Sequence, residues 1–319
     1  MLGAAREWNL LVRSGENRRV KDLTQQTQDP FKQGLCSSIV AWGSRPLVGQ
    51  AKAMCLLLLA FRQHPRYRLV IGANRDEFYD RPTSAAGFWV DAPGVLAGRD
   101  LREGGTWLGI TREGRFAALT NFRDSGSTRC SDRPSRGHLV SRFLLGDQPP
   151  DAYLVRLARD ADQYNGFSLI TGSGDALCYY SNREDVVRVL PPGVYGLSNH
   201  LLDTPWPKVT RGKRVMTELL AEADRLVPQA LFDLLADRSV AGDQELPATG
   251  VGIDQERWLS SLFVSSSVYG TRSSTVVLLD RQGEVTFVER TFNRDPDSFT
   301  AAAHTFRLSS VGGSGFPSS

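Results

Sequence analysis

The pattern of hydrophobic and polar residues changes abruptly at position 54. From there on, short apolar segments rich in branched and aromatic residues alternate with turn residues, which is typical of β-strands. Segments 55–61 and 68–74 flank the turn His64-Pro65-Arg66 and predict a β-hairpin. Three more hairpins are predicted, with strands at 107–110 and 115–120, at 167–171 and 176–181, and at 274–280 and 284–292.

Helical spacing occurs in two blocks, each of which predicts a pair of helices. The first block covers 137–145 and 151–164, and Pro150 is well placed to begin its second helix. The second block covers 211–226 and 228–236, where apolar residues form a stripe that we expect to pack in the core (Val215, Met216, Leu219, Leu220 and Ala223). Antiparallel hairpins with paired helices favour a layered α+β fold over a doubly wound parallel sheet.

The two ends of the chain differ from the body, which is predicted to be one domain over 54–293. Residues 1–53 are polar and basic without sustained periodicity, and we interpret them as an unstructured extension. They are either a removable leader or sequence upstream of a true start at Met54; a regulatory or targeting arm is the alternative. The only apolar patch there, 35–42, lies too far along for a secretory signal. Residues 294–319 are predicted to be a disordered tail.

Composition and charge exclude several classes of protein. Hydrophobic residues make up 41% of the 319 positions and charged residues 23%, which is typical of a soluble globular chain. No apolar run approaches the roughly 20 residues of a membrane-spanning helix. The first 53 residues hold eight basic and four acidic side chains, which leaves 30 and 31 for the rest. Because the body carries no basic excess, we expect no nucleic-acid partner.

Motif searches narrow the chemistry further. The four cysteines form no CxxC pair, which argues against a disulfide scaffold or zinc ribbon and suits a reducing, cytoplasmic location. The four histidines (His64, His138, His200 and His304) are too scattered for a metal site. The fingerprints of dinucleotide sites, P-loops and serine-nucleophile elbows do not occur. The sequence leaves the oligomeric state open.

The first predicted hairpin places a cysteine beside charged residues. If Arg62 pairs with Tyr67, Cys55 lies opposite Asn74, and the following residues 75–77 gather around its thiol. A cation such as Arg75 favours the thiolate and is expected to lower the thiol pKa from its usual ~8.5. Asp76 is then expected to orient Arg75 or a terminal amine.

The same cysteine gains a second role if Met54 initiates the chain and is removed. Cys55 then becomes the first residue, and its α-amine, with a pKa of about 7.7–8.0, can accept the thiol proton. One residue would supply both the nucleophile and the base. The alternatives are a buried, inert thiol at Cys55 and a structural ion-pair turn at Arg75, Asp76 and Glu77.

An ordered series of motifs between positions 54 and 276 carries a family resemblance. The matching stretches are MC at 54–55, NRDEF at 74–78, RPT at 81–83, GGTWLG at 104–109, ALTNFR at 118–123, SRG at 135–137, YNGF at 164–167, GLSN at 196–199, LDTPWPKV at 202–209 and YGTRSSTV at 269–276. On these motifs the chain resembles the NRDE family, which includes the transport-and-Golgi-organization proteins of animals. Residues 1–53 match nothing in the family pattern.

The resemblance implies a fold and a reaction. It implies the N-terminal-nucleophile hydrolase superfamily, with an αββα sandwich of two antiparallel sheets between helical layers, and the chemistry of choloylglycine hydrolases, which cleave linear amides. By that analogy Cys55 is the nucleophile, supported by Arg75 and Asp76. The resemblance also assigns three residues around the reacting acyl group, with Asn121 and Asn199 donating to its oxyanion and Arg272 completing the charge shell.

Two points limit the analogy. Arg75 and Asp76 are adjacent here, whereas those hydrolases space their Arg and Asp apart. Asn121 and Asn199 also have a structural alternative, because asparagine often caps turns. Glycines 104 and 105 and Trp107 are interpreted as serving backbone geometry and core packing.

Three classes of function therefore remain. The first is hydrolysis of a small-molecule amide, which requires no cofactor. The second is a non-catalytic carrier of haem or lipid, because the resemblance links the family to Golgi organisation, secretion and haem movement. The sequence has no CP motif and no evident axial pair, so a haem site would be weak. The third is a structural or interaction protein that retains a vestigial site.

Overall fold

The computed structural model describes residues 55–123, 132–222 and 226–309. The extension expected at residues 1–53 lies outside these ranges. Within these ranges the chain is mainly β-structure with helices in pairs. In chain order the strands are β1 (Cys55–Phe61), β2 (Tyr67–Phe78), β3 (Thr83–Phe88), β4 (Val95–Asp100), β5 (Leu108–Thr111), β6 (Phe116–Asn121), β7 (Phe167–Ser173), β8 (Ala176–Ser181), β9 (Val186–Val189), β10 (Gly193–Leu197), β11 (Tyr269–Asp280), β12 (Glu284–Phe292) and β13 (Phe299–Arg307). The helices are α2 (Gly137–Leu145), α3 (Pro150–Ala158), α4 (Pro207–Ala221), α5 (Pro228–Leu235) and α6 (Ile253–Leu259).

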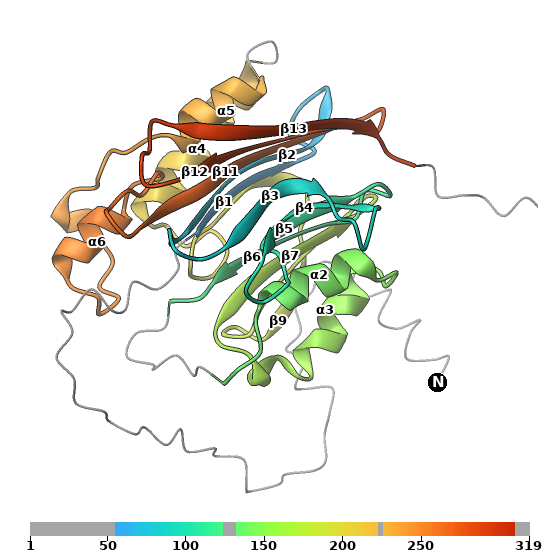
Figure 1. The fold of residues 1–319 in the computed structure, drawn as a ribbon, viewed down its shortest axis with the longest axis horizontal. Helices are drawn as coiled ribbons and strands as arrows, with labels where there is room; N and C mark the ends of the chain where they lie inside the picture. Colours follow the sequence, from blue (N-terminus) through green and yellow to red (C-terminus); the bar gives the residue numbers. More distant parts are fainter. Residues whose placement is uncertain (1–54, 124–131, 223–225, 310–319) are drawn as a thin grey trace, which may run out of the picture.

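The strands form two antiparallel sheets that are stacked face to face (Figure 1). One sheet has six strands in the order β10-β1-β2-β11-β12-β13, and the other has seven in the order β3 to β9. Helices α4 and α5 cover the outer face of the first sheet, and α2 and α3 cover that of the second. The predicted α+β fold with an αββα arrangement is thus confirmed.

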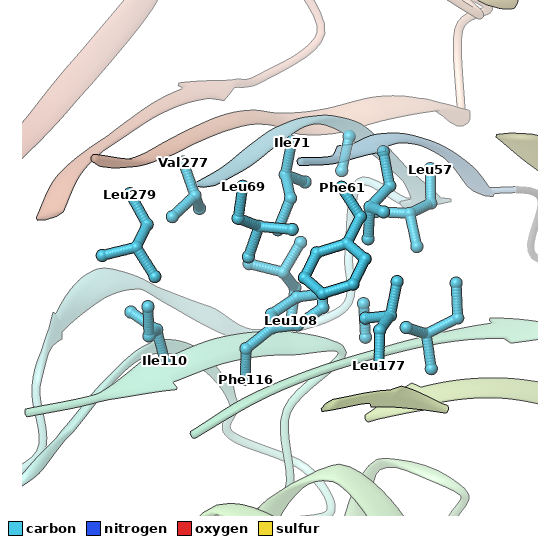
Figure 2. Packing of buried hydrophobic residues seen from close by; sticks show 14 of the residues in the cluster. Leu57, Phe61, Leu69, Ile71, Leu108, Ile110, Phe116, Leu177, Val277 and Leu279 are labelled. Carbon is cyan, nitrogen blue, oxygen red and sulfur yellow. The ribbon is translucent and has the colours of Figure 1, made fainter. Parts of the chain in front are cut away.

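Strand β1 explains why the apolar run after Met54 is continuous rather than alternating. Leu57, Leu59 and Phe61 point into the core between the sheets, and Figure 2 shows Leu57 and Phe61 packed against residues of the opposite sheet. Leu56 and Leu58 point the other way, into the core beneath α4 and α5. A strand buried on both faces needs apolar residues at every position, because neither face meets water.

The predicted helical stripe also lies in the core. Met216 and Leu220, on the inner face of α4, are buried, with Val215 and Leu219 partly buried beside them. Ala223 lies outside the described residues. Helix α4 begins at Pro207, four positions before the predicted start, with a proline in its first turn as helix N-termini favour. The helix predicted over 151–164 ends early, at Ala158.

The prediction of a disordered tail from 294 is wrong for residues 299–307. They form β13, the edge strand of the six-stranded sheet, and pair with β12 along its whole length. Phe306 packs against the core between the sheets, which gives the strand an apolar anchor. Alanines and threonines fill most of the other positions, so the strand shows little contrast between apolar and polar faces. Residues 310–319 lie outside the described part.

Among the described residues, no helix has both the length and the apolar character needed to cross a bilayer.

Candidate active site at Cys55

The hairpin of β1 and β2 positions the candidate nucleophile, with a register one residue away from the predicted one. Cys55 pairs with Arg75, not Asn74, and the hairpin closes where the Arg62 N–H donates to the Arg68 carbonyl at 2.8 Å. The turn is longer than predicted because Arg62 has a left-handed backbone (φ 54°) and the His64 ring accepts hydrogen bonds from two turn N–H groups.

This one-residue shift decides which side chains share the face of Cys55, because neighbouring positions on a strand point to opposite faces. Arg75 lies on the Cys55 face, between the sheets. Asn74 points toward the helices, where its Nδ2 donates to the carbonyls of Leu235 and Leu262 at 2.9 and 2.8 Å. The expected grouping around the thiol therefore loses Asn74, which links β2 to the helical layer instead.

Two side chains hold the backbone of Cys55. Its N–H donates to Asn199 Oδ1 at 2.9 Å, and its carbonyl accepts from Ser198 Oγ at 2.9 Å. Asn199 follows β10, the strand that pairs with β1, and has a left-handed φ of 52°. Its Nδ2 donates to the carbonyl of Asn121 at 2.9 Å. Asn199 thus joins the ends of β1, β10 and β6, and its amide is directed at backbone groups rather than at an acyl oxygen.

The thiol of Cys55 is more difficult to ionise than the sequence suggested. Cys55 is partly exposed as a residue, but protein surrounds its sulfur closely. Burial, reinforced by the negative charge of Asp76, raises the thiol pKa to about 12. The backbone N–H of Asp76 and the charge of Arg75 lower the pKa but do not outweigh burial. The expectation that Arg75 leaves the thiol with a depressed pKa is therefore wrong. Near neutral pH the thiol would need a nearby proton acceptor to ionise.

Arg75 lies against the opposite sheet. Its guanidinium sits 4.2 Å from the ring centroid of Trp107, and its Nη1 donates to Thr83 Oγ1 at 3.1 Å. Glu77 Oε2 lies 3.9 Å away, so the positive charge is partly balanced. Stacking and a hydrogen bond together fix the guanidinium beside Cys55.

Two glycines shape the loop between β4 and β5 that carries Trp107, as expected from the sequence. Gly104 has a φ of 77°, which non-glycine residues rarely adopt. A Cβ on Gly105 would lie 2.6 Å from the backbone carbon of Gly137, so only glycine permits this approach between the β4–β5 loop and the start of α2.

Asp76 occupies the other face of β2, in a buried setting. It is 1% exposed, and its Oδ1 accepts a hydrogen bond from Thr271 Oγ1 at 2.7 Å. Burial raises the pKa of its carboxyl, while Lys208 and Thr271 lower it. Lys208, on α4, is itself 1% exposed and was missed by sequence reasoning. A lysine in the first turn of an amphipathic helix is normally solvated, so only its place in the LDTPWPKV motif offered a signal.

A cavity of about 310 Å³ opens above Cys55. Asn121 lines it, as do Asp76 and Trp107. Half of the other lining residues are charged, with arginines and carboxylates in similar numbers, including Glu77, Arg81, Asp100, Glu103, Arg133 and Arg136. Arg81 is paired with Asp100 at 2.6 Å. The cavity is therefore suited to a small polar molecule that carries charges of both signs.

Arg272 does not belong to this cavity. Its Nη1 donates to three backbone carbonyls in the turn between β2 and β3, those of Phe78, Tyr79 and Arg81, at 2.9, 3.0 and 3.2 Å. Arg272 is not among the described residues that line the space above Cys55. It holds the turn in shape, so the expected place in a charge shell around the acyl group is not supported.

The structure thus brings Cys55, Arg75, Asp76 and Asn121 to one cavity and places Asn199 behind it. Known proteins match most of the chain. The sequence model of the family "Transport and Golgi organisation 2" matches residues 54–294. The Transport and Golgi organization protein 2 homologue from Bos taurus is 41% identical to this chain. The match covers 81% of this chain and all of the relative. The homologue from Homo sapiens is 37% identical with the same coverage.

More distant similarities are lower in identity. The Drosophila melanogaster protein of this name is 28% identical, over 75% of this chain and 92% of its own length. A solved structure of a mutant conjugated bile acid hydrolase from Clostridium perfringens is 10% identical, with a TM-score of 0.43, over 82% of this chain and all of that one. The family match and the mammalian relatives establish that the chain belongs to the Transport and Golgi organisation 2 family.

Proposed function

We propose that the chain hydrolyses a small, polar linear amide with Cys55 as its nucleophile. Cys55 carries this proposal, because it lines a polar cavity and both of its backbone polar groups are held by side chains. A nucleophile must be fixed within a fraction of an ångström of its productive position, and such anchoring provides that. A merely structural cysteine needs neither the anchoring nor the cavity.

The raised pKa of the thiol indicates which base would serve it. Near neutral pH the sulfur is protonated, so it attacks a carbonyl only when a nearby group accepts its proton. The backbone nitrogen of Cys55 is the nearest such atom once it becomes a free amine. Asn199 Oδ1, which accepts its hydrogen bond at 2.9 Å, would then orient that amine.

The reaction balances with these groups. The Cys55 sulfur bonds to the amide carbon while its proton passes to the α-amine. The carbon–nitrogen bond then breaks, the departing amine takes the proton, and a thioester remains. Water hydrolyses the thioester, releasing a carboxylic acid and restoring the thiol. Asn121, which lines the cavity, would donate a hydrogen bond to the oxyanion, a contribution of typically about 3 kcal/mol.

The second candidate, a carrier of haem or an acyl chain, finds less support. Of the described residues lining the cavity, Cys55 and His138 have side chains suited to ligating iron, and His138 Nε2 already contacts the carbonyl of Glu103 at 2.6 Å. The charged lining does not fit an apolar macrocycle or a fatty chain, which bind mainly through apolar contacts. These residues therefore do not fit haem.

The test compares one preparation before and after exposure of the Cys55 amine. A site-specific protease sequence placed ahead of Cys55 lets cleavage leave Cys55 as the first residue. Each form is incubated with a panel of N-acyl amino acids, and released primary amine is measured. We expect turnover only after cleavage. Equal release before and after cleavage would refute the role of the terminal amine.

Two cysteine variants provide the control. Cys55→Ala should abolish release after cleavage. Cys178→Ala should retain it, because Cys178 is also an unpaired cysteine but is buried in the core beneath α2 and α3. Activity that survives in the Cys55→Ala protein would contradict the proposal, and haem titration of the same protein would then test the carrier function.

A further inference from the structure

Helix α4 carries a lysine whose burial needs a local reason. Lys208 is 1% exposed, and no hydrogen-bond partner for its Nζ exists within the described part of the chain. Lys213, on the same helix, shows the usual arrangement: it is partly exposed and pairs with Asp203 at 2.7 Å. Burying an ammonium costs several kcal/mol unless an opposite charge compensates it.

Asp76 provides the opposite charge. Its Oδ1 is bonded to Thr271, whereas its Oδ2 is buried and has no hydrogen-bond partner among the described residues. Asp76 follows Arg75 on β2, so its side chain points toward the helical layer that contains Lys208. The two side chains interact electrostatically, and Asp76 is the strongest favourable charge acting on Lys208.

The other charges nearby largely neutralise one another. Arg123 and Glu256 also act on Lys208, but they form their own ion pair at 2.8 Å. Arg75 and Glu77 act on Asp76 and lie 3.9 Å from each other. Cys55 and Lys208 interact electrostatically, as do Asp76 and Cys55. Asp76 and Lys208 are therefore two buried charges that are balanced mainly by each other.

We propose that Lys208 is a positioning residue, whose ammonium keeps the Asp76 carboxylate ionised and balances its negative charge behind the thiol of Cys55. The inference rests on the proposed function, because it concerns the same site. Without the cation, the carboxylate either takes up a proton or opposes the formation of a thiolate. Burial opposes ionisation, since it holds the pKa of Asp76 above its ordinary value. The carboxylate therefore depends on the ammonium of Lys208 to stay ionised.

The first test titrates Asp76 directly in the full chain. Aspartate labelled with ¹³C at its carboxyl carbon is incorporated, and the Asp76 signal is assigned by its loss in Asp76→Asn. In Lys208→Met we expect the titration midpoint to rise by about one pH unit or more, because a close cation lowers a carboxyl pKa by about 1–3 units. Lys208→Gln provides a second neutral variant if the first does not fold.

Two further variants serve as controls. Lys208→Arg should keep the midpoint much closer to that of the parent protein, since it retains the cation. Lys213→Met, on the same helix, should leave it unchanged. An unaltered midpoint in a neutral Lys208 variant would overturn the inference, because it would mean that Lys208 does not set the charge of Asp76.

The second test measures the effect on Cys55 through its alkylation by iodoacetamide, followed by peptide mass spectrometry. Asp76→Asn should speed alkylation by about tenfold, which corresponds to about one pKa unit of the thiol. Adding Lys208→Met should abolish the gain, because the ammonium of Lys208, which favours the thiolate once Asp76 is neutral, is then lost. A double variant that keeps the gain would overturn the inference. Neither test measures amide hydrolysis, so this inference and the proposed function fail separately.

Discussion

The carboxamide of Asn199 accepts a hydrogen bond from the backbone N–H of Cys55 at 2.9 Å, across 144 positions of sequence. The same carboxamide donates to the carbonyl of Asn121. The site is therefore built on the join between three strand ends, β1, β6 and β10. This join positions Cys55, which lines the cavity.

Removing this carboxamide should destabilise the protein. In Asn199→Gly the backbone keeps its left-handed conformation, but the Cys55 N–H and the Asn121 carbonyl lose their partner. We expect the free energy of unfolding in urea to fall by about 1–3 kcal/mol, the usual cost of leaving buried polar groups unpaired. Asn199→Ala should lose about 1–2 kcal/mol more, because alanine is strained at positive φ. A glycine variant as stable as the parent would contradict this role.

The ionisation of Cys55 sets the pH dependence of its reactivity. Because burial raises the thiol pKa to about 12, only a small fraction is thiolate at neutral pH. With residues 1–54 attached, the rate of alkylation by iodoacetamide should rise about tenfold per pH unit from pH ~7 to ~10 without a plateau. Peptide mass spectrometry of the Cys55 fragment measures this rate. A plateau below about pH 9 would mean that the thiol ionises readily.

Arg75 should assist the thiolate although it does not determine its pKa alone. Arg75→Met removes a nearby cation, so we expect Cys55 alkylation at pH ~9 to slow by about tenfold. Arg112→Met is the matched control, because Arg112 also stacks on an aromatic ring, that of Phe88 at 3.8 Å, and is not among the described residues lining the cavity. Equal rates in the two variants would exclude an electrostatic role for Arg75.

Arg272 should matter for stability and little for the thiol. Arg272→Met leaves three turn carbonyls without their donor, and we expect the free energy of unfolding to fall by about 2–3 kcal/mol. Cys55 alkylation should stay within about threefold, less than half a pKa unit. Arg281→Met is the control, since Arg281 likewise donates to turn carbonyls, of Pro65 and His64, at the other end of β2. A tenfold slower alkylation of Cys55 in Arg272→Met would instead support the expected place of Arg272 in the charge shell around the acyl group.

The buried pair of Asp76 and Lys208 should reduce stability near neutral pH. The folded-state pKa of Asp76 is raised, so the folded protein binds the extra proton and stability falls as pH rises from about 4 toward neutrality. The folded-state pKa of Lys208 is lowered. Stability therefore recovers as pH rises from this lowered pKa toward the ordinary lysine pKa of about 10.4.

The double variant Asp76→Asn/Lys208→Met removes both effects. We expect it to be more stable than the parent by about 1–4 kcal/mol near neutral pH, because it no longer buries two charged groups. The difference should shrink at pH ~5 and at pH ~10, because one partner of the pair is then neutral in the folded parent. Urea unfolding at three pH values measures it. A constant difference across that range would contradict the assigned pKa shifts.

The hairpins and the layered fold could be predicted because they follow from local patterns. Apolar segments of strand length on either side of turn residues, and helical stripes in pairs, leave few alternatives. The register of β1 and β2 could not, because the backbone of Arg62 and the ring of His64 lengthen the turn, and no hydrophobic pattern reports either. Strand β13 was missed because its residues contrast too little in hydrophobicity.

The site was predictable in part for the same reason. Cys55 and Arg75 come together through one hairpin, so local reasoning placed them within one residue of the truth. Asn199 reaches Cys55 through the pairing of β10 with β1, which no local pattern indicated, and only the resemblance gave Asn199 a place at the site. Lys208 was missed because its burial depends on a distant carboxylate on β2. Long-range pairings of this kind leave no trace in local periodicity.

The most direct test of the central claim is to trap the thioester. The protein cleaved to begin at Cys55 is mixed with the panel of N-acyl amino acids, quenched in acid within seconds, and analysed by intact-mass and peptide mass spectrometry. The account predicts that the protein gains the mass of an acyl group, located on Cys55, and that Cys55→Ala gains none. An acyl group on another residue, or amine release from the Cys55→Ala protein, would contradict it.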